Sequence, residues 1–325
     1  MRIAVLGAGA VGSYLGSRFA AAQADVHLIA RGAHLAALRE KGLTLITPDG
    51  VISTPVWATD EPASIGPVDI VLFCVKSYDT DDAVEQLPPL VGPDTAVISI
   101  QNGIGNEAKI AAKIGEDHVL GAATYILSAI EAPGVVRSGP ARIVIGELRE
   151  GPPSERVKRI VELARAGGID ASATSDARRA KWEKYVLLVA FSAVTAATQL
   201  TVGDIRASAA ASGMLRAIMT EAWSIGRALG VPLPADLVER AYKLVLAQDD
   251  DEGTSLRHDL LTGHRMELDA LKGNLRRLGR ETGIPTPWTD AAFAILEPWA
   301  HRNDRRSRAA AAAAGATVAA ASTRA

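Results

Sequence analysis

The feature that most constrains the fold is the glycine spacing at the start of the chain, MRIAVLGAGAVGS. A short apolar run precedes Gly7, Gly9 and Gly12, which form a G-x-G-x-x-G pattern, and a helical pattern follows it. Between a strand and a helix, this spacing indicates a dinucleotide-binding turn. Gly7 would allow the tight turn, Gly9 would let the backbone approach a pyrophosphate, and Gly12 would let the helix pack closely on the strand. The helix N-terminus would then face the phosphates. An ordinary glycine turn is the alternative.

The pattern that follows alternates apolar, strand-like runs with helical segments, which is typical of an open α/β sheet. From about Asp176 the β-branched runs become scarce and amphipathic helical patterns dominate. We therefore expect an α/β Rossmann-type dinucleotide-binding domain over residues 1–172 and an all-α domain over residues 173–307. An alanine-rich tail over residues 308–325 would extend the last helix or fray. The expected strands are RIAVLG, DVHLIAR, LTLIT, DIVLFCVK, TAVISIQNG, HVLGAATYILSAI and ARIVIGEL.

Composition excludes several classes of function. The formal net charge is −2, which gives no general electrostatic reason to expect nucleic acid or an anionic membrane as a partner. The single cysteine, Cys74, rules out an intrachain disulfide framework. The sequence shows neither a secretory signal nor an uncharged apolar run of about 20 residues, so we expect a soluble, cytoplasmic protein. His258 and His264 are not spaced with other ligands, and we expect no metal site.

Residues at the ends of the expected strands suggest which dinucleotide binds. The second strand ends in Ala30-Arg31, where NAD-binding sites usually carry an acid. An arginine at this place suits a 2′-phosphate, so we infer NADPH, with a solvated surface arginine as the alternative. Lys76 lies at the carboxyl end of the fourth expected strand, and Asn102 lies at the end of the fifth. Ligands of doubly wound sheets bind outside the carboxyl ends of strands, so both residues should face the cofactor and the substrate.

A further motif, KWEKYVLLVAFSAVTAAT, begins the second half of the chain. Its first turn carries two lysines, and the rest is almost wholly apolar. An ammonium group is costly to desolvate, so Lys184 beside so apolar a helix needs an explanation. One explanation is a lysine that snorkels to water from the helix end. The other is a lysine that lines a cleft and has a ligand as its partner.

Taken in order, VKSYDT, SIQNGIGNE, KWEK and the segment from GTSLRHD to MELD make the chain resemble the ketopantoate reductase (2-dehydropantoate 2-reductase) family from residue 1 to about 305. The resemblance implies NADPH-dependent reduction of 2-dehydropantoate to D-pantoate, a step toward pantothenate and coenzyme A. It implies that Lys184 is the catalytic lysine. Lys76 and Asn102 match residues at the nicotinamide and substrate, and Ser255 and Glu267 match the substrate-binding serine and the acid that completes the site.

The chemistry agrees with these roles. Hydride transfer to a ketone leaves an alkoxide, which needs a proton donor and a nearby cation, and an ammonium group at Lys184 can be both. Glu267 could hydrogen-bond to a substrate hydroxyl or orient the lysine, and Ser255 could hold substrate oxygen atoms. The cleft between the two domains is the natural place for such a site.

Two positions depart from the family pattern. Members carry K-x3-N-x3-N on the lysine helix, and the corresponding residues here are Leu188 and Ser192, on nearly the same helix face as Lys184. Both should contact the substrate, but with fewer polar groups. The alternatives are therefore a reductase of another 2-oxo acid by the same mechanism, or a non-catalytic protein that binds or senses NADPH.

The apolar helical domain could also supply a homodimer interface.

Overall fold

The computed structural model describes residues 1–322, with side chains through residue 309. Its internal contacts divide the chain into two units, Met1–Lys181 and Trp182–Ala325. The division falls inside helix α6 (Ala177–Thr198), shortly after the boundary expected at residues 172–173. The first unit is an α/β domain and the second is helical, which confirms the predicted fold class.

The centre of the first unit is a set of four parallel strands. They are β1 (Arg2–Leu6), β2 (Asp25–Ile29), β6 (Val68–Phe73) and β7 (Val91–Ser99), and they lie side by side in the order β2-β1-β6-β7. Each pairs in parallel with its neighbour. The carboxyl ends of all four strands therefore meet at one edge of the sheet, and the predicted glycine turn follows the first of them.

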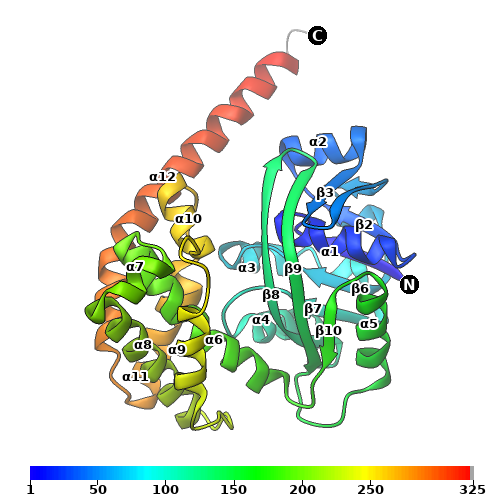
Figure 1. The fold of residues 1–325 in the computed structure, drawn as a ribbon. Coiled ribbons are helices and arrows are strands. Elements are labelled where there is room, and N and C mark those ends of the chain that lie inside the picture. Colours follow the sequence, from blue (N-terminus) through cyan, green and yellow to red (C-terminus); the bar gives the residue numbers. More distant parts are fainter. Residues whose placement is uncertain (323–325) are drawn as a thin grey trace. The chain divides into compact units, whose positions relative to one another are not determined.

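The complete sheet has ten strands, in the order β4-β3-β9-β8-β7-β6-β1-β2-β5 with β10 beside β9. The strands β8 and β9 form a long antiparallel hairpin, which Figure 1 shows in green. The short strands β4, β5 and β10 are additions to the predicted set, because pairing with a neighbour rather than an apolar run defines them. The remaining bounds are β3 (Leu43–Thr47), β4 (Gly50–Thr54), β5 (Trp57–Thr59), β8 (Val119–Ala132), β9 (Val135–Glu147) and β10 (Asp170–Ala173).

Helices cover both faces of this sheet, which explains why its central strands are apolar throughout. Successive residues of a strand point to opposite faces. Ile3 and Val5 of β1 belong to the core on the side of α1, α2 and α5, and Ala4 and Leu6 belong to the core beneath α3 and α4. The bounds of these helices are α1 (Ala10–Ala21), α2 (Gly32–Lys41), α3 (Thr80–Val84), α4 (Asn106–Ile114) and α5 (Glu155–Ala166).

One predicted helix is much shorter than the sequence pattern indicates. The segment YDTDDAVEQLPPLV forms only the five residues of α3, with 3₁₀ turns before and after it. After Val84 the N–H groups of Gln86 and Leu87 bond three residues back, to Ala83 and Val84, and Pro88 and Pro89 then prevent an α-helix from resuming because proline donates no backbone hydrogen bond. The 3₁₀ turns of the first unit are Pro62–Ser64, Ser77–Asp79, Pro88–Leu90 and Glu116–His118.

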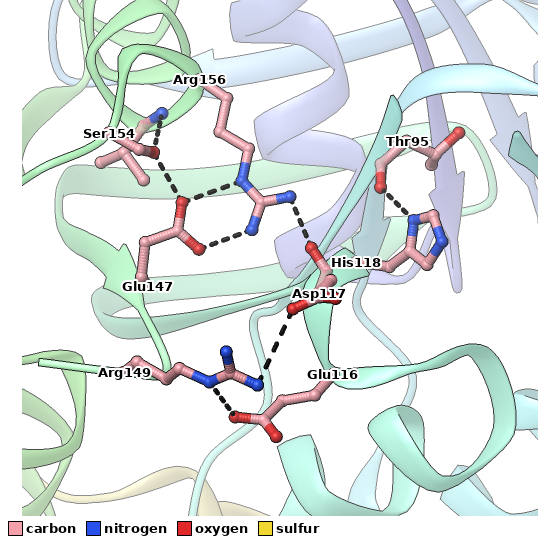
Figure 2. Close-up of polar contacts among 9 residues, drawn as sticks. Thr95, Glu116, Asp117, His118, Glu147, Arg149, Ser154 and Arg156 are labelled. Carbon is pink, nitrogen blue, oxygen red and sulfur yellow. Dashed lines mark hydrogen bonds and ion pairs between the residues drawn. The ribbon is translucent and has the colours of Figure 1, made fainter. Parts of the chain in front are cut away.

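A charged contact joins the end of β9 to the start of α5 (Figure 2). Arg156 donates to both oxygens of Glu147, at 2.8 Å from Nε and 2.5 Å from Nη2. Ser154 caps α5 and donates to the same carboxylate at 2.6 Å. Burial opposes the charge of Glu147, but the hydrogen bonds outweigh this effect and hold the pKa of its carboxyl below the usual value. The pairing fixes the helix that covers β9.

The second unit is built from helices packed through their apolar faces. After α6 these are α7 (Val202–Ala207), α8 (Ala209–Ala228), α9 (Leu237–Leu246), α10 (Ser255–Thr262), α11 (Asn274–Thr282) and α12 (Pro287–Ser322), with a π-helical turn at Asp269–Gly273. The helix α12 continues into the alanine-rich segment, one of the two outcomes expected for the tail. Within residues 1–322, no helix has both the length and the apolar character needed to cross a membrane.

A buried acid holds the start of α12. Glu221 of α8 is 8% exposed and accepts hydrogen bonds from the backbone N–H groups of Trp288 and Thr289, at 2.8 and 3.0 Å. The hydroxyl of Thr289 also donates to it, at 2.5 Å. The carboxylate thus satisfies two backbone donors that the first helical turn cannot pair, and its charge faces the positive end of the helix dipole.

We expect Glu221→Ala to lower the free energy of unfolding by about 2 kcal/mol or more, because it leaves backbone donors without an acceptor. Urea unfolding followed by circular dichroism measures this loss. Glu239→Ala is the control, since Glu239 forms an exposed ion pair with Arg216 and should cost at most about 1 kcal/mol. Equal losses of unfolding free energy in the two variants would show that the helix cap contributes no more to stability than an exposed ion pair.

Candidate functional site

A pocket of about 200 Å³ lies at the carboxyl edge of the central strands of the first unit. The glycine turn forms one wall, and the end of β2 with the start of α2 forms another. More distant segments, after β6 and in the β8–β9 hairpin, close it. The residues that line it are Leu6, Gly7, Ala8, Gly9, Ile29, Ala30, Arg31, His34, Val75, Gln86 and Ile130.

The three glycines of the turn are required for different reasons. Gly7 has φ +94°, and a Cβ there would lie 2.8 Å from the backbone nitrogen of Val75. A Cβ on Gly12 would lie 2.4 Å from the carbonyl oxygen of Gly7. The packing of the protein therefore demands these two glycines. At Gly9 the backbone is extended, and a Cβ would meet no described atom within 4 Å.

The open space at Gly9 fits a group that approaches from outside the protein. Gly9 is the N-cap of α1, and among the described side chains none caps that end of the helix. The first backbone N–H groups of a helix have no intrahelical acceptor and carry partial positive charge, so they suit a phosphate. These features fit the pyrophosphate of a dinucleotide at this turn.

Arg31 and His34 belong to the pocket wall that is formed by the start of α2. Arg31 is exposed and is the N-cap residue of this helix. The backbone N–H of Gly134 donates to Nδ1 of His34 at 3.1 Å, so Nε2 carries the hydrogen and donates to Ser13 at 3.2 Å. Burial lowers the pKa of His34, although its interaction with the backbone of Ala8 opposes the fall. A neutral imidazole therefore links α1, α2 and the hairpin turn.

Lys76 and Asn102 lie on the loops that follow β6 and β7, at the same edge of the sheet, but they are not among the residues that line the pocket. Lys76 is exposed and Asn102 is half-buried. The loops are joined by Gln101, whose Nε2 donates to the carbonyl of Val75 at 3.0 Å and to the hydroxyl of Thr80 at 2.7 Å. The topology thus brings the two predicted residues to the edge that carries the glycine turn.

In the second unit, the predicted residues lie on α6, at the start of α10 and just before the π-helical turn. Lys184 and Leu188 are half-buried, whereas Ser192, a further turn along the same face, is 1% exposed. Glu267 is buried two residues before the π-helical turn begins, and Ser255 is the exposed first residue of α10. The hydroxyl of Ser192 is engaged inside the unit, where it donates to the carbonyl of Leu188 and accepts from Lys272.

The start of α10 is held against α6 by two threonines. Thr254 caps α10 by accepting from the backbone N–H of Arg257. Its hydroxyl is 2.8 Å from that of Thr195, which donates to the carbonyl of Phe191 within α6. Because Thr195 uses its hydrogen on Phe191, Thr254 is the donor of the pair. This contact fixes the position of Ser255 relative to the helix that carries Lys184.

Three functional candidates escaped sequence reasoning. Gln86 and Ile130 line the pocket, but they come from distant parts of the chain and no motif marks them. Lys272, in the π-helical turn, is fully buried and donates a hydrogen bond to Ser192. Its place between apolar residues and a glycine, LKG, could have drawn attention, but it reads equally well as an exposed lysine on a helix.

Alanine substitutions at two of the glycines should separate ligand binding from folding. Gly9→Ala should leave the melting temperature nearly unchanged, since φ is negative and the space is open. If the dinucleotide expected from the sequence is NADPH, the added Cβ should block its phosphate and weaken its binding by ~10-fold or more. Gly12→Ala should lower the free energy of unfolding by about 1–3 kcal/mol because its Cβ collides with the turn. Differential scanning calorimetry measures the stability of both variants, and titration of nucleotide fluorescence measures their affinity for NADPH. Unchanged NADPH affinity in Gly9→Ala would place the phosphate elsewhere.

Comparisons with known proteins agree with this arrangement. The sequence model of ketopantoate reductase PanE/ApbA matches residues 3–150, and that of its C-terminal part matches residues 176–299. A 2-dehydropantoate 2-reductase of Mesorhizobium japonicum is 33% identical, over 91% of this chain and 97% of the relative. One from Halobacterium salinarum is 34% identical, over 88% of this chain and 95% of the relative.

A solved structure agrees as well. The crystal structure of a PanE/ApbA family ketopantoate reductase from Ralstonia eutropha matches with a TM-score of 0.86 and 32% identity, over 94% of this chain and all of that chain. The two family models thus match the two halves of the chain in order, and relatives match it over nearly their whole length. The chain belongs to the ketopantoate reductase family.

Proposed function

We propose that this protein catalyses the NADPH-dependent reduction of 2-dehydropantoate to D-pantoate. The observation that carries the proposal is the match to both halves of the family, with relatives named 2-dehydropantoate 2-reductase at about a third identity. The pocket at the glycine turn supports the cofactor part of the proposal, since its open space at Gly9 fits a phosphate group.

The residues that would hold NADPH come from four loops of the first unit. Gly7, Gly9 and Gly12 shape the turn for the pyrophosphate, and Arg31 pairs with the 2′-phosphate as a planar, charged donor. Lys76 and Asn102 border the nicotinamide and the substrate. When bound, NADPH supplies the hydride that adds to C2 of the ketone.

The residues proposed for the chemistry belong to the helical unit. Lys184 donates a proton to the carbonyl oxygen as negative charge develops there, and its ammonium stabilises that charge beforehand. Glu267 accepts a hydrogen bond from the substrate hydroxyl. Ser255, exposed at the start of α10, binds substrate oxygen atoms, and Leu188 contacts the apolar part of the substrate.

The test is NADPH oxidation by wild type and Lys184→Ala against a panel of 2-oxo acids: ketopantoate, trimethylpyruvate, benzoylformate and pyruvate. We expect wild type to prefer ketopantoate over trimethylpyruvate, which lacks the hydroxyl. Lys184→Ala should lose at least ~10²-fold in turnover with NADPH affinity retained, because it removes the acid. A preference for benzoylformate would indicate a reductase of another 2-oxo acid. Silence across the panel would favour a binding protein, and a fully active Lys184→Ala would rule out its role.

The nucleotide preference has a separate test. We expect Arg31→Asp to raise KM for NADPH by ~10-fold or more and to favour NADH, because a carboxylate repels the 2′-phosphate and accepts from ribose hydroxyls. Steady-state kinetics with both nucleotides give the ratio of kcat/KM values. Arg39→Asp is a charge-matched control, since Arg39 forms an exposed ion pair with Asp60 and lies outside the residues that line the pocket. An unchanged ratio in Arg31→Asp would mean that other residues recognise the phosphate.

A further inference from the structure

Lys272 is a fully buried lysine for which the proposed mechanism has no use. Its side chain is 0% exposed, although lysines are almost never fully buried unless they are paired. Burial holds the pKa of its amine well below the usual value, and the nearby Glu267 carboxylate offsets part of that fall. Taking an ammonium group out of water is costly, so this residue carries a penalty that an apolar side chain would avoid.

Ser192 accepts a hydrogen bond from Lys272. The hydroxyl of Ser192 donates to the carbonyl of Leu188 at 2.5 Å and accepts from Nζ of Lys272. Its only hydrogen is therefore committed to its own helix, and its oxygen is turned toward the lysine. At a position where the family resemblance leads us to expect an asparagine, this chain has a serine that holds a lysine from another segment.

The backbone around Lys272 is also shaped for this contact. The N–H of Asn274 bonds to the carbonyl of Asp269, five residues earlier, which makes the wide turn of a π-helix. Such turns are rare and occur frequently at functional sites. The hydroxyl of Tyr185 on α6 donates to the carbonyl of Leu271 at 2.5 Å. Two consecutive residues of the turn, Leu271 and Lys272, are thus bound by the helix that carries Lys184.

We propose that Lys272 is a positioning residue for substrate recognition: held by Ser192, it fixes the neighbouring Glu267 carboxylate so that this acid can accept the hydroxyl of the substrate. The inference rests on the proposed function. Glu267 is buried five residues before Lys272, and its carboxylate favours the charged form of the lysine. The π-helical turn, which begins directly after Leu268, brings Lys272 to Ser192. Lys272 acts from within the unit, through Glu267, without touching the reacting atoms.

A purely structural role for Lys272 predicts the opposite effect on stability. Methionine has a similar length and fills irregular apolar space, so Lys272→Met removes the desolvation cost while keeping the packing. If the lysine serves substrate recognition, Lys272→Met should be at least as stable as wild type. It should also discriminate less between ketopantoate and an acid that lacks the hydroxyl. If the lysine serves only the fold, the variant should melt earlier and the active fraction should keep the wild-type KM.

The experiment compares Lys272→Met, Ser192→Ala and the double variant by NADPH oxidation and thermal unfolding. We expect Lys272→Met to raise KM for ketopantoate by ~10-fold or more, as the loss of an orienting charged contact implies, with KM for NADPH and the melting temperature maintained. Kinetics with trimethylpyruvate should barely change, because it has no hydroxyl for Glu267. Since Ser192 acts by holding Lys272, the double variant should cost no more than Lys272→Met alone.

Lys243→Met is the matched control, because Lys243 is an exposed lysine of α9 paired with Glu239. A wild-type KM for ketopantoate in Lys272→Met, at any melting temperature, would overturn the inference. So would equal effects on ketopantoate and trimethylpyruvate, or additive effects of the two substitutions. Wild type that ignores ketopantoate but reduces another hydroxylated 2-oxo acid would contradict the proposed function alone, and the same comparison then applies to that acid. If the wild-type protein oxidised NADPH with none of the acids, the proposed function and the role of Lys272 would both be overturned.

Discussion

The close approach of the glycine turn to the loop after β6 is the constraint on which the pocket at this turn depends. A Cβ at Gly7 would collide with Val75, and one at Gly12 would collide with Gly7 itself, so the turn closes only without side chains. This packing sets the start of α1 directly over the carboxyl edge of the parallel strands. The helix N-terminus, Arg31 and the loops that carry Lys76 and Asn102 are brought to one edge as a consequence.

In the helical unit, buried polar contacts position the helices, as the glycine packing positions the turn in the first unit. Glu221 holds the start of α12, Thr254 and Thr195 hold α10 against α6, and Ser192 receives Lys272. Each is a satisfied polar group inside an apolar unit, and each specifies one geometry where hydrophobic packing alone would tolerate several. Lys272 differs from the others because it buries the amine of a lysine, and the cost of that burial is the reason to look for a role beyond the fold.

Much of the fold could be predicted from local patterns. The apolar run in residues 68–73 reads as a covered strand and is one, and the amphipathic patterns after Asp176 form helices. The strands β5 and β10 were missed because three or four residues of mixed polarity acquire strand structure only from the neighbour that pairs with them. The helix expected across YDTDDAVEQLPPLV is short because the chain tightens into three-residue turns after Val84 and Pro88 and Pro89 keep an α-helix from resuming; the sequence did contain the proline signal.

The sequence by itself determined the glycine turn, the division into α/β and helical halves, and the resemblance that the family comparisons confirm, because each is carried by residues close together in the chain. Only the tertiary structure decided that Gln86 and Ile130 close the pocket, that His34 is a neutral link beside it, and that Lys272 points inward to Ser192. These features depend on long-range contacts and on a π-helical turn that shifts the helical register, and no local periodicity encodes either.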